Sequence, residues 1–151
     1  MKNLFNGSLL FLLFVPLFSC REDPKPVDLL VDGCSGVSFY YLDNQSSRSL
    51  SVEFVSQSSL NGKIDPTTAI ASKQRLLIGQ DARAFGVVPR PTDTFSEVTL
   101  YATIDGVKQA VYQQNPVRNE LWVKVKQNAS NPDCGHYTVS HTLTVTDALL
   151  K

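Results

Sequence analysis

Apolar and polar residues alternate along most of the chain beyond residue 33, in short runs separated by turn residues. The alternation is clearest in residues 50–55, 98–104 and 137–146. A period of two is that of a strand with one buried face, because successive side chains of a strand point to opposite sides. No segment keeps a helical period for more than about two turns, and residues 147–151 have room for one terminal turn. The pattern predicts an all-β domain.

Composition predicts further strands. Residues 37–42 contain three consecutive aromatic residues, which favour strands, and residues 121–126 alternate. Residues 85–88 predict another short strand, which Pro89 ends. Residues 68–78 are ambiguous, because the alanines near their start weaken the strand interpretation.

The strongest turn signal is Asp105-Gly106, which joins residues 98–104 to residues 107–113. Asp-Gly suits the two positive-φ positions of a type I′ turn, so a hairpin is predicted here. Seven or eight strands in all, about 8–15 residues apart, are typical of an antiparallel immunoglobulin-like β-sandwich.

The amino-terminal residues follow a different pattern. Lys2 provides a basic start, an almost unbroken apolar run covers residues 9–18, and Ser19 precedes Cys20. This combination is typical of a secretory signal peptide, and the apolar run is too short to cross a membrane. Residues 1–19 are therefore predicted to be a signal peptide.

Removal of residues 1–19 from the 151-residue chain leaves 132 residues, enough for one domain with a sizeable core. Without Lys2, thirteen lysines and arginines face fourteen aspartates and glutamates, a net charge of −1. There is no block of like charge, which argues against a nucleic acid partner.

The residues Leu17-Phe18-Ser19-Cys20 resemble the lipobox of bacterial lipoproteins. The resemblance implies that the Cys20 sulfur receives a diacylglycerol, that the chain is cut before Cys20, and that the new amino terminus is acylated. Two or three acyl chains anchor a protein stably, so a membrane is an implied partner. Residues 20–32 would be the lipidated cysteine and a tether, in which Pro24 and Pro26 disfavour helix. Extended, this tether reaches about 35–40 Å.

The signal region is similar to that of lipoproteins of Bacteroidota, where serine before the cysteine is common and an acidic cluster after it can direct the protein to the surface. Arg21-Glu22-Asp23 matches that cluster in part. Residues 33–151 resemble the small β-sandwich lipoproteins of such genomes, chiefly in residues 93–101 and 121–124. The resemblance implies an outer membrane lipoprotein, on the periplasmic side or at the cell surface, and it carries no assigned catalytic residue.

Two cysteines remain once Cys20 is assigned to lipid. An exported protein meets an oxidising compartment, so Cys34 and Cys134 are predicted to pair as a disulfide. The chain-entropy model gives such a loop of about 100 residues a stabilisation of at most about 4–5 kcal/mol. Two free buried thiols are the alternative.

Little in the chain suggests catalysis, a cofactor or a metal. His141 lies on the apolar face of residues 137–146 and is predicted to be a core histidine bonded to a backbone carbonyl. His136 lies two residues after Cys134, but a fourth zinc ligand and closely spaced ligand pairs are missing. There is no G-x-S-x-G elbow and no phosphate-binding glycine loop. Three acidic residues in the centre of the chain, which is predicted to be rich in loops, leave hydrolysis as the least favoured hypothesis: Asp81, Asp93 and Glu97.

Two aromatic residues are the candidate ligand-binding residues. If Val123 and Val125 face inward, Trp122 faces outward, and the same alternation puts Tyr101 on an outer face. Exposed Trp and Tyr stack on sugar rings or anchor a protein partner. The alternative is that each covers apolar surface at the edge of a sheet. The sequence thus predicts a non-enzymatic, lipid-anchored binding or structural module of the cell envelope, whose partner is an envelope protein or, in the alternative hypothesis, a glycan.

Overall fold

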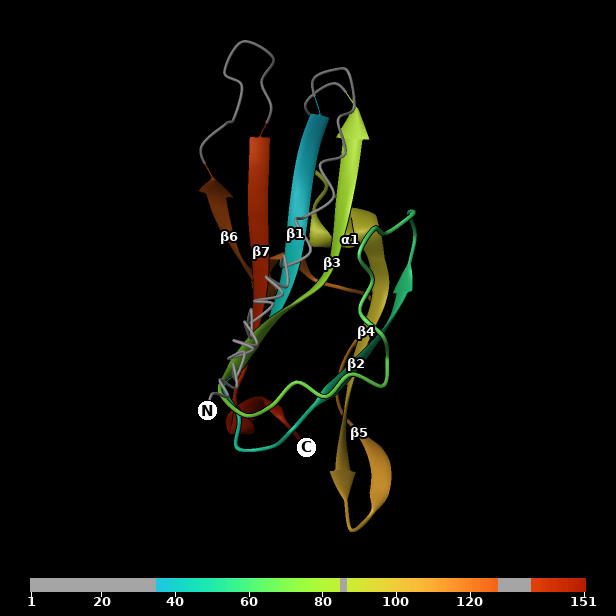
Figure 1. Ribbon diagram of the computed structural model, residues 1–151, viewed down its shortest axis with the longest axis vertical. Coiled ribbons are helices and arrows are strands. Elements are labelled where there is room, and N and C mark those ends of the chain that lie inside the picture. Colours follow the sequence, from blue (N-terminus) through green and yellow to red (C-terminus); the bar gives the residue numbers. More distant parts are fainter. Residues whose placement is uncertain (1–34, 85–86, 128–136) are drawn as a thin grey trace, which may run out of the picture. The chain divides into compact units, whose positions relative to one another are not determined.

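Seven strands in two sheets make up most of the part of the chain that the computed structural model describes, residues 35–84, 87–127 and 137–151 (Figure 1). These residues all belong to the unit Val31–Lys151. The predicted signal peptide, the tether and several residues singled out above lie outside the described residues: Cys20, Cys34, Cys134 and His136.

One sheet has four strands and the other has three. The four-stranded sheet has the order β3 (Gln74–Ala84), β1 (Ser35–Asn44), β7 (Tyr137–Val145), β6 (Trp122–Gln127). The three-stranded sheet has the order β2 (Ser51–Ser56), β4 (Phe95–Ile104), β5 (Val107–Gln114). The described helices are single turns: α1 (Pro91–Thr94), η1 (Asn119–Leu121) and η3 (Asp147–Leu149).

The strand order corrects two parts of the predicted fold. Strands β1 and β7 pair in parallel, with Gly36 opposite Tyr137 and Asn44 opposite Val145, whereas the other pairs are antiparallel. In an immunoglobulin constant domain the first strand shares its sheet with the second, fourth and fifth. Here β1 shares its sheet with β3, β6 and β7, so the immunoglobulin-like connectivity is not confirmed.

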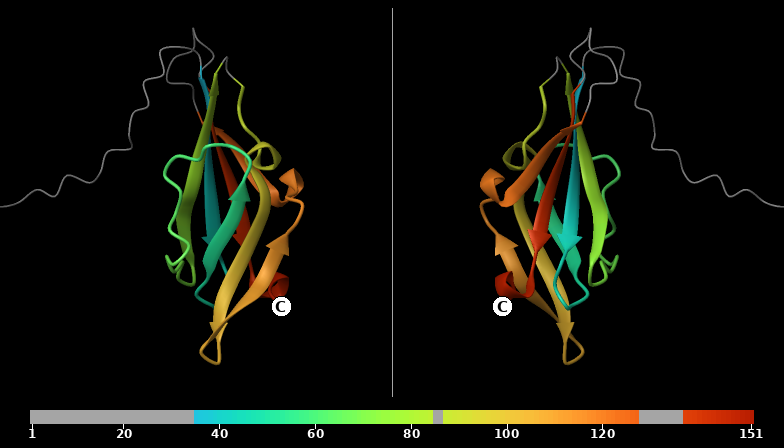
Figure 2. Two further views of the ribbon diagram at one scale, coloured as in Figure 1. Left: turned by 90° about the vertical axis from the view of Figure 1, so that its right-hand side faces the viewer. Right: turned by 90° about the vertical axis from the view of Figure 1, so that its left-hand side faces the viewer.

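A single hydrophobic core receives side chains from both sheets. Tyr40 and Leu42 of β1 belong to it, as do Val98 and Leu100 of β4. The strands of the two sheets form two layers (Figures 1 and 2), and each layer buries one face against the other. The all-β, sandwich-like architecture predicted from the alternating pattern is confirmed.

The predicted hairpin is present. Asp105 and Gly106 both have positive φ angles, 52° and 79°, between β4 and β5. The predicted terminal turn is also present, as η3. Residues 87–88 form no strand, and in the ambiguous segment 68–78 a strand begins only at Gln74.

The segment after β3 returns across the inner face of β1. Gly36 makes room for it, because a Cβ there would collide with the backbone of Val87. Further along β1, the side chains of Ser38 and Tyr40 donate hydrogen bonds to the carbonyl oxygen of Pro89. This segment is therefore held against β1 by hydrogen bonds to its backbone.

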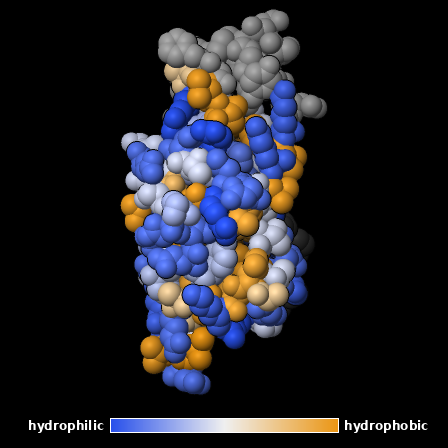
Figure 3. All heavy atoms as spheres, turned by 180° about the vertical axis from the view of Figure 1, so that it is seen from behind, coloured by the Kyte–Doolittle hydropathy of each residue, from blue (hydrophilic) through white to orange (hydrophobic). Residues whose placement is uncertain are grey.

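The surface carries no extended apolar face among the described residues. Figure 3 shows one side of the molecule, on which hydrophilic residues predominate and hydrophobic residues are scattered. The exposed large hydrophobic residues come from several different elements: Val55, Val87, Val107, Val123, Val125 and Leu149. Scattered residues of this kind are ordinary on a soluble surface.

Candidate functional site

Trp122 lies in the core, which corrects the outward orientation expected for it. Its side chain is 4% exposed and stacks on Phe95, with ring centroids 5.9 Å apart. Trp122 pairs with Leu143 across β6 and β7, and directly paired residues point to the same face. Because Leu143 faces the core, Trp122 does too, and Val123 is left 61% exposed. Trp122 is not available to a ligand.

Tyr101 points outward from β4, as expected, and is partly exposed. The ammonium of Lys108 lies 4.5 Å from the centre of its ring. Lys108 also donates a hydrogen bond of 2.6 Å to Glu53, and this bond lowers the pKa of the Glu53 carboxyl group. Desolvation, with the nearby Glu53 carboxylate, raises the pKa of Tyr101. One face of the aromatic ring is thus already covered by a cation.

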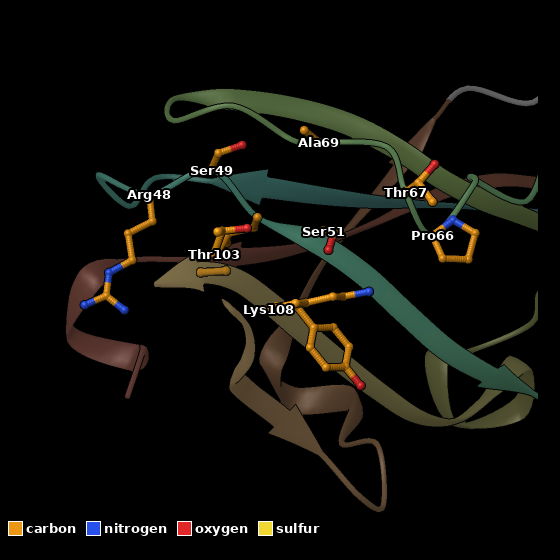
Figure 4. A pocket seen from close by; sticks show the side chains of 11 residues that line it. Arg48, Ser49, Ser51, Pro66, Thr67, Ala69, Thr103 and Lys108 are labelled. Carbon is orange, nitrogen blue, oxygen red and sulfur yellow. The ribbon is translucent and has the colours of Figure 1, made fainter. Parts of the chain in front are cut away.

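A pocket of about 470 Å³ adjoins Tyr101 on the outer face of the three-stranded sheet. We call it the Tyr101 pocket; its wall comes from the four segments 48–51, 66–69, 101–103 and Lys108. Figure 4 shows Arg48 at one end and Thr67 at the other, with Lys108 between them. The volume falls within the roughly 300–1,000 Å³ of small-molecule sites.

Backbone pairing holds the loop wall of this pocket in place. Leu50 and Ile70 exchange two backbone hydrogen bonds, of 3.0 and 2.7 Å, and both side chains are buried. Asn44 donates a further side-chain bond to the Ile70 carbonyl. Asp65 accepts bonds from the backbone and the hydroxyl of Thr67, which fixes the turn beside the pocket. The loop wall of the pocket is therefore held in place by buried residues of the hydrophobic core.

The charged and uncharged polar groups of the pocket differ in their hydrogen bonding. Lys108 is paired with Glu53, and Arg48 donates a bond of 3.2 Å to the Lys151 backbone oxygen. Among the described residues, the pocket hydroxyls of Ser49, Ser51 and Thr103 have no hydrogen-bond partner. The pocket side chains that lack a hydrogen-bond partner among the described residues are thus hydroxyls, while Arg48 and Lys108 each already make one bond.

A smaller hollow of about 140 Å³ shares Tyr101 with this pocket and is lined by Glu53 and Glu97. Glu97 accepts hydrogen bonds from three neighbours at 2.9–3.0 Å: Thr99, Gln113 and Asn115. Its carboxylate is therefore already satisfied by side chains of the same region.

The three carboxylates considered for hydrolysis lie in regular elements rather than in loops, which corrects the sequence interpretation. Asp81 belongs to β3 and is buried, Asp93 belongs to α1 and pairs with Arg90, and Glu97 belongs to β4. The bond from Arg90 lowers the pKa of Asp93. Of the three, only Glu97 lines either of the two hollows described above.

A buried polar network occupies the interior beside the segment that follows β3. The Tyr40 hydroxyl lies 2.6 Å from Thr94 Oγ1, which donates to Asp81 at 2.9 Å. Ser58 donates to the same Asp81 oxygen at 2.8 Å. Burial raises the pKa of Tyr40 to about 12. These contacts satisfy a buried carboxylate and give the network a structural role.

His141 is a core residue, as predicted. It is 3% exposed, its ring stacks on that of Tyr40 with centroids 5.5 Å apart, and it hydrogen-bonds the backbone of Pro89. Desolvation, with a smaller contribution from Lys124, lowers its pKa to about 4. Nε2 of His141 has no hydrogen-bond partner among the described residues.

Comparison with protein-family models and with the sequences of curated proteins finds no match. Within the described residues, no helix has the length and apolar character needed to cross a membrane. In the same residues, no three side chains of His, Cys, Asp or Glu come together in a way that could hold a metal ion.

Sequence reasoning identified Tyr101 but missed the rest of the pocket. The outward orientation of Ser51 could have been inferred from the sequence, because Ser51 alternates with buried Val52; in the structure it pairs with Tyr101 across β2 and β4. Lys108 follows from the hairpin, in which it pairs with Thr103. The wall formed by residues 66–69 had no signal, since its position depends on a bridge between Leu50 and Ile70.

Proposed function

We propose that this chain is a lipid-anchored binding module of the bacterial cell envelope that performs no catalysis. The Tyr101 pocket is the observation that carries the proposal. It is of small-molecule size, its wall is fixed by core contacts, and three of its hydroxyls have no partner in the part of the chain that the structure describes.

The composition of the pocket supports binding rather than catalysis. Its wall contains no His, Cys, Asp or Glu. A serine or threonine hydroxyl is a weak nucleophile without an adjacent base. Lys108, the nearest candidate, is hydrogen-bonded to Glu53. The pocket is thus equipped to hold a ligand and lacks the groups that would transform it.

Blocking the pocket tests this proposal. Ala69 is exposed on the pocket wall, so Ala69→Trp is expected to fill the cavity and leave the core intact. The full chain would be used to retain envelope components from a detergent extract, and bound glycan and protein would be quantified. We expect Ala69→Trp to bind the retained component at least about tenfold more weakly than the wild type, which corresponds to about 1.4 kcal/mol of binding free energy.

The matched control is Ala84→Trp, which changes an exposed alanine at the end of β3 in the other sheet. It is expected to retain the same component as the wild type. Equal retention by wild type and Ala69→Trp would contradict a binding role for the pocket.

The anchor is proposed from the lipobox resemblance. Lipid on Cys20 and a tether over residues 21–32 would present the domain at the outer membrane, on its periplasmic side or at the cell surface. Labelled palmitate is expected to enter the wild type and to be absent from Cys20→Ala, as measured by autoradiography of the purified chains. Equal labelling of the two chains would contradict the assignment.

The proposed disulfide between Cys34 and Cys134 is supported by the pairing of their neighbouring strands. Parallel pairing of β1 and β7 puts Gly36 opposite Tyr137, so the two strands begin at the same end of the sheet. Adjacent strands lie about 4.8 Å apart, and each cysteine is within three residues of one of these positions. Intact-mass analysis is expected to find the chain heavier by two hydrogen atoms after treatment with reductant; identical masses would indicate two free thiols.

A further inference from the structure

We infer that the Tyr101 pocket binds a neutral saccharide. This inference rests on the proposed binding function and narrows it to one class of ligand. It depends on which groups of the wall are already engaged and which are free.

The free polar groups match sugar hydroxyls. Ser49, Ser51 and Thr103 come from neighbouring segments, and their hydroxyls have no partner within the described part of the chain. A hydroxyl both donates and accepts, so each can bond a sugar hydroxyl in either sense. A ligand with many hydroxyls would satisfy all three at once.

Each of the two cations of the wall already makes a hydrogen bond within the chain. Lys108 is hydrogen-bonded to Glu53 at 2.6 Å. Arg48 donates to the Lys151 backbone oxygen, and the carboxylate of Asp147 is close enough for Arg48 to lower its pKa. An acidic ligand would have to compete with these contacts and would meet the charge of Glu53 and Asp147, which disfavours it.

The apolar part of the wall matches the carbon face of a sugar ring. Pro66 and Ala69, both exposed, provide this apolar surface on the loop side. The ring of Tyr101 is covered by Lys108 on one face, so the ligand would contact its edge rather than stack on that face. This arrangement replaces the flat stacking on Trp122 and Tyr101 expected from the sequence.

Calorimetric titration tests the inference. The full-length chain, in a detergent that contains no sugar, would be titrated with neutral oligosaccharides of glucose, mannose and galactose and with oligosaccharides of galacturonate. At least one neutral oligosaccharide is expected to bind. Thr103→Val and Ser51→Ala each remove one hydroxyl and are expected to weaken that binding about three- to tenfold.

Two variants serve as controls. Thr144→Val removes a threonine hydroxyl from β7 in the four-stranded sheet, whereas the pocket adjoins the three-stranded sheet. This variant is expected to leave binding unchanged. Arg48→Gln is the control for an acidic ligand, because it removes a charge that such a ligand would need and that already bonds the Lys151 backbone oxygen in the free chain.

Three results would overturn the inference. Binding of galacturonate alone, lost in Arg48→Gln, would show an acidic ligand and leave the proposed binding function standing. Failure of every oligosaccharide to bind would exclude the saccharide class, while the Ala69→Trp comparison would still report on the pocket. Binding that persists in Ala69→Trp would contradict both the inference and the proposed function.

Discussion

Replacing Trp122 by alanine is expected to lower the free energy of unfolding by about 3–5 kcal/mol, the usual cost of deleting a large buried aromatic side chain. Domains of this size are stable by only about 5–15 kcal/mol, so the loss is a large fraction of the total. Urea denaturation followed by circular dichroism measures it as a fall in the midpoint with little change in slope.

The physical reason is the position of the indole against two buried rings, Phe95 and Tyr40. It stacks on Phe95 at 5.9 Å and meets Tyr40 edge-on at 6.1 Å, and Phe95 in turn contacts Tyr40 and Phe54. Deletion would leave a cavity at the contact of the two sheets, since Tyr40 and Phe95 come from different sheets. The surrounding strands cannot collapse freely into it.

Two further variants at β6 make this prediction specific. Trp122→Phe keeps an aromatic ring and removes an indole N–H that has no hydrogen-bond partner in the described residues, so we expect a loss of only about 1–2 kcal/mol. Val125→Ala changes a residue of the same strand that is 52% exposed, and we expect a change within about 0.5 kcal/mol. A loss in Trp122→Ala no larger than that in Val125→Ala would contradict the buried position of the indole.

The strands that the sequence predicts well are those in which one face is buried and the other is exposed to solvent. Residues 98–104 and the Asp105-Gly106 turn are correct in the structure because alternation and turn chemistry are local properties. Residues 137–146 follow the same rule, and His141 lies on the buried face as the alternation predicts.

The orientation of β6 was wrong because the local pattern is misleading there. Val123 and Val125 alternate like core residues, yet they are exposed and Trp122 is buried. The face of a strand is fixed by its register with the neighbouring strand, here Trp122 opposite Leu143, and no short stretch of sequence contains that information.

The strand order and the pocket depend on longer-range contacts still. The parallel pairing of β1 with β7 joins strands separated by most of the domain, and the immunoglobulin-like order is not confirmed. The Tyr101 pocket depends on the pairing of β2 with β4 and on the bridge between Leu50 and Ile70. Of the pocket residues, Tyr101 alone was identified from the sequence.

The stability of the domain is expected to fall as the pH is lowered from about 6.5 to about 4, because of His141. In the unfolded chain this histidine titrates near its ordinary pKa of 6.5, whereas burial in the folded domain lowers its pKa to about 4. Between these values the unfolded state binds a proton that the folded state does not, so acid favours unfolding. The pKa difference corresponds to a loss on the order of 3 kcal/mol, complete by pH 4. Midpoints of urea denaturation across this range measure it.

Among the described groups with a shifted pKa, Glu53 also titrates inside this window: the bond from Lys108 lowers its pKa below the ordinary 4.5, so Glu53 adds to the loss only near the acidic end. Hydrogen bonds from Arg90 and Ser47 lower the pKa values of Asp93 and Asp147, so the stability that these carboxylates contribute is lost at more acidic pH. Tyr40, which stacks on His141, has a pKa raised to about 12 and stays neutral throughout. Lys124 lies opposite His141 on β6 and contributes electrostatically to the lowered pKa of the histidine.

The chain has only two histidines, which provides a matched control. His141→Phe keeps a ring against Tyr40 and removes the titrating group, so its stability is expected to be nearly flat between pH 6.5 and 4, although lower at neutral pH through loss of the bond to Pro89. His136→Gln is expected to retain the full pH dependence of the wild type. If the slope survived in His141→Phe, or vanished in His136→Gln, the acid sensitivity would belong to another group and the buried neutral state of His141 would not be its cause.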